Sequence, residues 1–173
     1  MKKKILCVIL CLLFCIGLSA CGFEKGEYDY SEGSYFIFQS HSVEKYVDSQ
    51  LQKEGSYTIK NGILSIDYGE KTEEFNYGNN VIYSLSPLDR GFIPDSDRFD
   101  ATCSNKDGSY ICQFYANGTF VKTFNLFNIR IENFTGYYRR SGDIITIEYE
   151  DGGYTNMYVH EGKLFDTAYV LKS

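Results

Sequence analysis

The stretch GSYTIKNGILSIDYG, residues 55–69, decides the fold, because it has the pattern of a complete strand–turn–strand unit. Tyr57 and Ile59 alternate with polar residues, which is the two-residue period of a half-buried β-strand. Asn61-Gly62 follows, and this pair is typical of tight hairpin turns because both positions need positive φ. Alternation then resumes as far as Tyr68. We therefore predict a β-hairpin.

The same pattern returns at residues 136–150 as GYYRRSGDIITIEYE. At a constant offset of 81 residues, five positions are identical: Gly55 and Gly136, Tyr57 and Tyr138, Ile63 and Ile144, Ile66 and Ile147, Tyr68 and Tyr149. This repeat predicts two related halves, residues 33–86 and 108–173. Residues 87–107, which hold both prolines of the chain, are the predicted connector.

Strand formers dominate both halves, since tyrosine, phenylalanine, isoleucine, valine and threonine suit a pleated, half-buried surface. Helical spacing occurs over residues 43–51, but the matching residues 119–131 have a strand pattern, which favours strand in both halves. The repeat is also longer than the roughly 20–50 residues of solenoid units. We predict an all-β fold, an antiparallel meander or barrel of about 8–12 strands, because closure removes exposed sheet edges.

The hairpins of the second half resemble those of small lipocalin-like domains in lipoproteins of Gram-positive bacteria. The resemblance covers four segments, Phe114–Phe120, Gly136–Tyr138, Asp143–Tyr149 and Gly162–Phe165. It implies a lipocalin-like barrel, and it implies little chemistry because such domains mostly have no assigned activity.

The N-terminus has the three parts of a secretory signal, namely Lys2 to Lys4, an apolar run over residues 5–18, and small residues before residue 21. The apolar run is shorter than the roughly 20 residues that span a bilayer as a helix. Leu18-Ser19-Ala20-Cys21 resembles the lipobox of bacterial lipoproteins, which implies that Cys21 is acylated and becomes the first residue of the mature chain.

A cysteine that carries two acyl chains is stably anchored in a membrane. We therefore predict a signal peptide over residues 1–20, a lipidated polar tether over residues 21–32 and a β domain over residues 33–173. The protein is expected to be extracytoplasmic and attached to the cell membrane through the lipid on Cys21.

The mature chain is acidic. Without the three lysines of the signal it has 14 basic and 23 acidic residues, a net charge of −9. This charge argues against nucleic acid as a partner. It suits solubility, and it also suits a basic protein partner.

Two cysteines, Cys103 and Cys112, lie beyond the signal and the lipobox. Outside the cytoplasm an isolated pair favours a disulfide, and the turn-forming residues 105–108 allow the two to meet. Free thiols are the alternative. A metal site is not predicted, because the two histidines, His41 and His160, have no ligand spacing relative to the cysteines.

No catalytic set is recognisable. Neither histidine has a neighbouring nucleophile in a GxSxG context. The acidic run over residues 95–100 departs from a calcium loop, because the sixth and twelfth positions hold Asp100 and Lys106 rather than glycine and glutamate. We predict neither an enzyme nor a cofactor.

Aromatic residues are abundant, with 16 tyrosines and 13 phenylalanines. Packing in the core and across strands explains most of them. Neighbours in a strand point to opposite faces, so adjacent tyrosines place some rings outside the core; our candidates for a binding surface are Tyr137, Tyr138, Tyr154 and Tyr158. We predict an interaction module for an envelope protein. The alternative is a lipocalin-like binder of a small apolar molecule or glycan, which needs a lumen of several hundred Å³.

Overall fold

The computed structural model describes residues 23–126 and 129–172. The predicted signal peptide and the lipidation site Cys21 lie outside these residues. Within them, no helix is long and apolar enough to cross a membrane.

The described residues form an all-β structure, and every strand pairing is antiparallel. The strands are β1 Gly26–Ser31, β2 Ser34–Phe38, β3 Ser42–Val47, β4 Gln50–Lys60, β5 Ile63–Asp67, β6 Thr72–Gly78, β7 Val81–Tyr83, β8 Ala101–Ser104, β9 Tyr110–Phe114, β10 Thr119–Leu126, β11 Ile129–Ser141, β12 Ile144–Tyr149, β13 Tyr154–His160, β14 Lys163–Phe165 and β15 Ala168–Leu171.

These 15 strands exceed the predicted number, partly because two of them lie in segments that were predicted to be irregular. The predicted tether, residues 21–32, contains β1, and its Tyr28 is fully buried. The predicted connector, residues 87–107, contains β8. The folded part therefore begins no later than Gly26, because the alternating Tyr28 and Tyr30 add a strand to the sheet.

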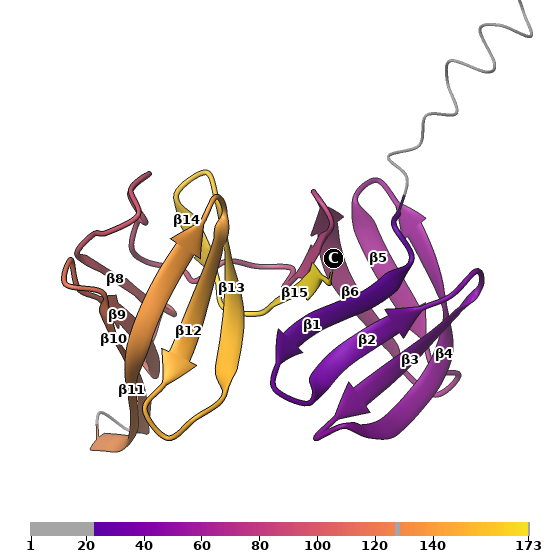
Figure 1. The fold of residues 1–173 in the computed structure, drawn as a ribbon, viewed down its shortest axis with the longest axis horizontal. Coiled ribbons are helices and arrows are strands. Elements are labelled where there is room, and N and C mark those ends of the chain that lie inside the picture. Colours follow the sequence, from indigo (N-terminus) through magenta and orange to yellow (C-terminus); the bar gives the residue numbers. More distant parts are fainter. Residues whose placement is uncertain (1–22, 127–128, 173) are drawn as a thin grey trace, which may run out of the picture.

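The first barrel consists of β1 to β7 in chain order, closed by β15 (Figure 1). β15 pairs with β7 through Val170 and Val81, and with β1 through Val170 and Asp29, so the eight strands form a ring. Its interior is filled by buried side chains, more than half of them aromatic: Tyr28, Phe36, Phe38, Val43, Leu64, Ile66, Tyr77, Ile82 and Tyr169. This closed eight-stranded antiparallel barrel confirms the predicted fold class.

The second sheet runs from β8 to β14, and the connector between the halves fills the gap between its two edges. The Leu88 N–H donates a hydrogen bond of 2.8 Å to the Leu164 carbonyl of β14. On the other side Arg90 and Ser104 of β8 exchange two hydrogen bonds of 2.9 and 3.0 Å. The connector thus closes a second barrel as its eighth segment, beside the seven strands β8 to β14. The core of this barrel includes Phe114 and Ile147.

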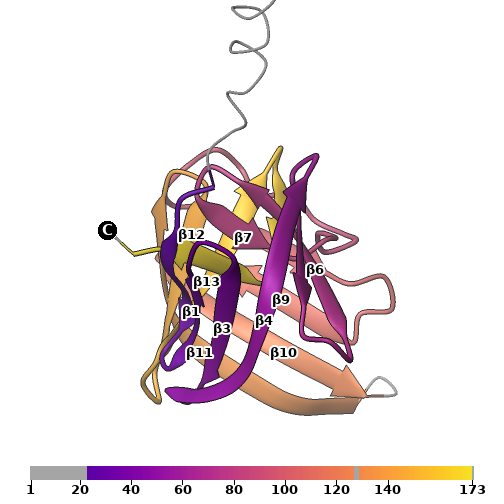
Figure 2. The same ribbon diagram turned by 90° about the vertical axis from the view of Figure 1, so that its right-hand side faces the viewer.

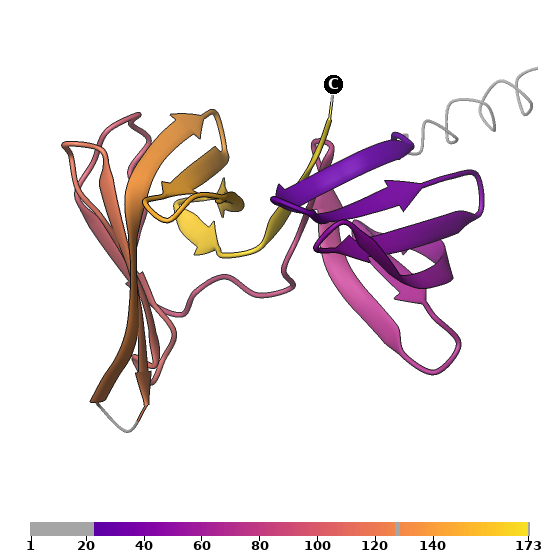
Figure 3. The ribbon, with the colours of Figure 1, turned by 60° about the horizontal axis from the view of Figure 1, so that its bottom comes forward.

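The chain therefore crosses between the two barrels twice. β15 follows β14 in the chain but closes the first barrel, whereas the connector follows β7 but closes the second. Figure 3 shows both crossings between the two lobes, with β15 in yellow and the connector in pink. The first barrel therefore takes its last strand from the second half, and the second barrel is closed by the connector that directly precedes it, so neither predicted half contains all the segments of its own barrel.

The repeat predicted the two matching hairpins. Asn61 and Gly62 both have positive φ, 53° and 75°, as the turn between β4 and β5 requires. Gly55 and Gly136 occupy equivalent positions where a Cβ atom would lie 2.4 Å from the Asp67 carbonyl and 2.3 Å from the Glu148 carbonyl. Only glycine permits this close approach of neighbouring strands, so both halves need it.

Candidate binding site at the mouth of the second barrel

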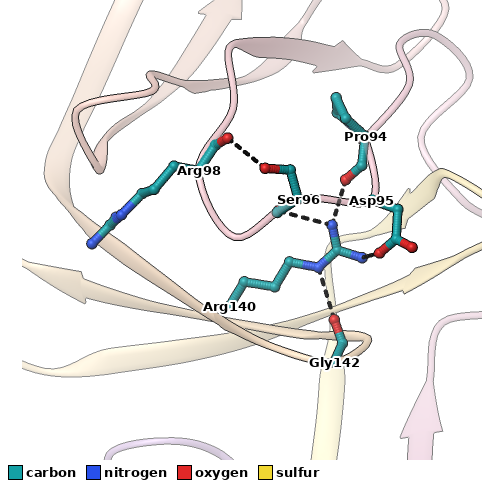
Figure 4. Close-up of polar contacts among 6 residues, drawn as sticks. All are labelled: Pro94, Asp95, Ser96, Arg98, Arg140 and Gly142. Carbon is teal, nitrogen blue, oxygen red and sulfur yellow. Dashed lines mark hydrogen bonds and ion pairs between the residues drawn. The ribbon is translucent and has the colours of Figure 1, made fainter.

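One end of the second barrel is plugged by connector residues 94–99. The Arg140 side chain is only 5% exposed, and its guanidinium donates hydrogen bonds to the carbonyls of Pro94, Ser96 and Gly142 (Figure 4). It also pairs with the Asp95 carboxylate at 3.4 Å. Asp95 therefore lies among the contacts that hold connector residues 94–96 against Arg140 of β11.

Two further contacts hold the same plug. Arg98 donates a hydrogen bond of 2.8 Å to the Tyr138 carbonyl, and its guanidinium lies 5.2 Å from the centre of the Tyr138 ring. The Tyr138 hydroxyl accepts a hydrogen bond from the Phe99 N–H at 2.9 Å. These contacts fix the connector across one end of the barrel.

The opposite end is open. β10 and β11 continue beyond the neighbouring strands as a long hairpin, which projects from the lobe in Figure 2. Beneath it lies a cavity of about 420 Å³. The residues that line it come from both barrels: Tyr30, Ser31, Lys122, Phe124, Phe134, Tyr149, Asp151, Gly152, Tyr154 and Thr155.

The wall of the cavity is largely aromatic. The ring of Phe134 lies between those of Phe124 and Tyr149, with centroids 6.0 Å apart in both pairs and edge-to-face geometry. Burial raises the pKa of Tyr149, so its phenol stays protonated at neutral pH. Strand alternation aims these side chains into the barrel, below the filled core that contains Phe120 and Ile147.

Two polar side chains, Lys122 and Thr155, lie among these aromatic rings. The Lys122 ammonium lies 5.2 Å from the ring centre of Tyr110 and 5.3 Å from that of Phe124. Among the side chains that the structure describes, no carboxylate lies within ion-pair distance of Lys122. The Thr155 hydroxyl is buried and has no hydrogen-bond partner among the described residues.

The first barrel supplies one side of the cavity through β1. Ser31 of β1 pairs with Thr155 of β13, and the Asn156 amide donates a hydrogen bond of 3.2 Å to the Asp29 carbonyl. The Tyr154 hydroxyl donates a hydrogen bond to the Asp29 carboxylate. Burial and this carboxylate raise the pKa of Tyr154. The contact between the barrels thus helps to shape the mouth.

A second hollow of about 580 Å³ lies on the outer face of β11 to β13, behind Tyr154. Its lining is mostly polar and includes Arg139 and Glu148, which form an ion pair with each other. Since these charges already neutralise one another on an exposed surface, this hollow offers weaker recognition chemistry than the mouth.

Of the four tyrosines predicted to form a binding surface, one lines the cavity. Tyr154 does so, and Tyr137 is 58% exposed on the outer face of β11. Tyr138 and Tyr158 are 0% and 2% exposed, so their assignment to a binding surface was wrong. Alternation points Tyr138 inward.

Tyr158 is covered by the other barrel. Its ring lies 4.5 Å from that of Tyr83 in β7, and it packs in a cluster with Val81, Phe165 and Ala168. This cluster lies where the two barrels meet, so its burial depends on a contact between the halves that the local pattern does not contain.

The predicted disulfide is not formed in this structure. Cys103 and Cys112 are directly opposite each other in β8 and β9, but both are free and buried. Burial raises the pKa of Cys103 to about 11. Burial likewise raises the pKa of Cys112 to about 12, although the Lys122 charge acts in the opposite direction.

Both thiols should therefore be unreactive in the native protein. In a chain that begins at Gly22, we expect a disulfide-exchange reagent at pH 8 to modify them at least about a hundredfold more slowly than unfolded thiols, because only about one thiol in a thousand is ionised. Reagent absorbance should report two thiols after unfolding. No thiol released on unfolding would show that the pair had oxidised to the predicted disulfide.

The lining residues Lys122, Phe124, Phe134 and Thr155 were not predicted. A signal for one of them exists in the sequence, because Lys122 interrupts an alternating apolar row between Phe120 and Phe124. A lysine on the inward face of a barrel strand is expensive to bury and therefore suggests a function.

The histidines take no part in this site. His41 and His160 are exposed, and the ring of His160 stacks on Tyr158. Among the described residues, no group of three or more histidine, cysteine or acidic side chains is arranged to hold a metal ion.

No protein-family model, curated protein or solved structure matches this chain. The function is therefore inferred from the geometry of the chain itself.

Proposed function

We propose that the protein is a membrane-anchored binding protein of the cell envelope, which holds a small apolar molecule at the mouth of its second barrel. The observation that supports this most strongly is the aromatic cavity of about 420 Å³. Ligand sites typically measure about 300–1,000 Å³ and combine apolar walls with a few polar groups. A ligand would occupy the mouth, since the core side chains fill the barrel above it.

The predicted anchor fits this arrangement. Phe23 packs against Tyr28, Phe38 and Tyr77 of the first barrel, with ring centroids 4.8–5.5 Å apart. Cys21 precedes Phe23 by two residues, which span at most about 7 Å when extended. A lipid on Cys21 would therefore hold the first barrel close to the bilayer surface. In Figure 1 the start of β1 and the β10–β11 hairpin lie at opposite ends of the molecule, so the mouth would face away from the membrane.

Lipidation has a direct test. We expect Cys21→Ser to abolish incorporation of labelled fatty acid and to release the protein from membranes, since two acyl chains provide the anchor. Fractionation and autoradiography of cells that produce each form measure both effects. A wild-type protein without label would overturn the anchor.

Binding can be tested with N-phenyl-1-naphthylamine, a neutral dye that fluoresces in apolar sites. We expect saturable binding of one dye per chain, weakened at least tenfold by Phe134→Ala, because the Phe134 ring packs against both Phe124 and Tyr149 in the wall. Tyr137→Ala is the matched control, since this exposed ring lies on the opposite face of the same strand. Absence of saturable binding, or equal binding by the two variants, would contradict the proposal.

A protein partner in the envelope is the second candidate, and exposed Tyr137 and Tyr115 favour it, at 58% and 40% exposure. Exposed tyrosines are common anchors in protein interfaces. Under this alternative, Tyr137→Ala should abolish capture of a specific envelope protein in crosslinking while the melting temperature stays unchanged.

A further inference from the structure

We infer that the ligand of the mouth cavity is an anionic amphiphile, whose apolar body contacts the aromatic wall and whose oxyanion is held by Lys122 and Thr155. This inference rests on the proposed function and specifies the ligand class. It is supported by the two polar side chains on the inner face of the cavity, Lys122 and Thr155.

Lys122 is placed to meet a ligand. It lies in β10 between Phe120 and Phe124, so alternation turns it into the barrel, where it pairs in register with Cys112. Its ammonium lies over two aromatic rings and lines the cavity. Cation–π contacts replace only part of the hydration that a lysine loses on entering a barrel. An oxyanion would supply the missing counter-charge.

Thr155 provides an independent observation. Its side chain lines the same cavity, only 4% of the residue is exposed, and its hydroxyl has no partner among the described residues. Buried hydroxyl groups are nearly always hydrogen-bonded in native proteins, so an unpartnered one on a cavity wall suggests a ligand atom. A hydroxyl group can donate one hydrogen bond to an oxyanion, in addition to the charge-assisted bond from the ammonium.

Tyr110 lies next to Lys122 but is not one of the residues that line the cavity. The Lys122 ammonium lies over its ring, and its buried hydroxyl interacts with the Cys112 thiol. Burial raises the Tyr110 pKa, and the phenol therefore remains a donor at neutral pH. The donors on the cavity wall are therefore the Lys122 ammonium and the Thr155 hydroxyl, and both favour a ligand with acceptor oxygens.

The acidic residues orient the ligand. Asp151 lines the cavity at its exposed rim, in the turn between β12 and β13, and would repel an anion that remained there. The charge of Asp166 also raises the pKa of Tyr110 and Cys112, less than burial does, and it limits the positive potential near Lys122. The oxyanion is therefore expected next to Lys122, and the apolar body along Phe134 and Tyr149.

A matched pair of dyes tests this inference. The dye 8-anilinonaphthalene-1-sulfonate has the skeleton of N-phenyl-1-naphthylamine with one added sulfonate. In the chain from Gly22 onward, which carries both barrels, we expect Lys122→Met to weaken binding of the sulfonate dye at least tenfold. Binding of the neutral dye should change less than twofold. Thr155→Val should weaken only the sulfonate dye, about threefold, and Lys122→Arg should retain most of its affinity.

Lys53→Met is the control, because the Lys53 ammonium lies 5.0 Å from the Tyr68 ring in the first barrel, away from the cavity. It should change neither affinity. Competition separates the chemical sources: octanoate and octyl phosphate should both displace the sulfonate dye, whereas inorganic phosphate should not. Displacement by inorganic phosphate alone would mean a simple anion site and would overturn the amphiphile.

The two proposals fail in different ways. If neither dye binds the wild-type chain, the proposed function fails and this inference fails with it. If both dyes bind and Lys122→Met weakens them equally, the cavity binds ligands but Lys122 is part of its apolar wall, and only this inference is overturned. Melting temperatures within a few degrees of the wild type establish that the variants are folded.

Discussion

A chain that ends at Thr167 is expected to lose the first barrel. β15 is the partner of both β7 and β1, so its removal exposes two strand edges at once. It also removes Tyr169, whose ring packs 4.5 Å from that of Phe36 and 5.3 Å from that of Tyr30. Truncating one large core side chain costs about 3–5 kcal/mol, against a total stability of about 5–15 kcal/mol.

Amide hydrogen exchange measures this outcome by segment. We expect β1 to β7 to lose protection, while β8 to β14 retain it because the connector still closes their barrel. A chain that lacks only Lys172 and Ser173 is the control and should keep both barrels. Retained protection of β1 to β7 after the longer deletion would show that β15 is not needed for the first barrel.

β15 ties the two barrels together, because it follows the second barrel in the chain but closes the first. The barrels also touch directly, through the cluster around Tyr158 and through one β1–β13 register pair, Ser31 with Thr155. Separation of the barrels would therefore require opening the ring of the first. The mouth cavity depends on the same contact, since its wall includes residues of β1.

The local part of this fold could be predicted from the sequence. Alternation and the turn residues predicted both hairpins, and the structure gives them the same register, Tyr57 opposite Ile66 and Tyr138 opposite Ile147. The closing segments could not be predicted in this way. β15 has four residues, and nothing local indicates that it pairs with β7 rather than with the strands of its own half.

The candidate site was harder to predict for a similar reason. In Tyr137-Tyr138 alternation requires one ring inside and one outside, but does not say which. Lys122 of β10 and Thr155 of β13 form one site only because both strands line the same cavity as β1. This arrangement is not visible in the local sequence pattern. The tyrosine hypothesis therefore located one residue of the mouth, Tyr154, and missed its polar groups.

Alkaline unfolding is the second large effect that we expect. Burial raises the pKa of several tyrosines well above the ordinary value, and five of them are Tyr28, Tyr68, Tyr110, Tyr149 and Tyr169. A raised pKa in the folded state means that the folded chain retains protons that the unfolded chain releases above about pH 10. Stability is therefore fully present below pH 10 and decreases as the pH rises.

The slope is steep because the tyrosines act together. Each contributes up to about 1.4 kcal/mol per pH unit, so five contribute up to about 7 kcal/mol per unit, against a total stability of about 5–15 kcal/mol. We expect cooperative unfolding within about two units above pH 10. Tyrosinate absorbance and far-ultraviolet circular dichroism should change in the same transition, whereas gradual ionisation without loss of strand signal would contradict the prediction.

Two variants identify the origin of the effect. The Tyr68 hydroxyl is buried without a hydrogen-bond partner among the described residues, so Tyr68→Phe removes a titrating group and sacrifices no hydrogen bond. Stability at neutral pH should be retained, and the alkaline midpoint should rise by a few tenths of a pH unit, since about a fifth of the slope is lost. Tyr137→Phe should leave the midpoint unchanged, because this ring is 58% exposed and lies outside the core. Equal midpoints for Tyr68→Phe and Tyr137→Phe would mean that ionisation of other groups, and not of the buried tyrosines, unfolds the barrels.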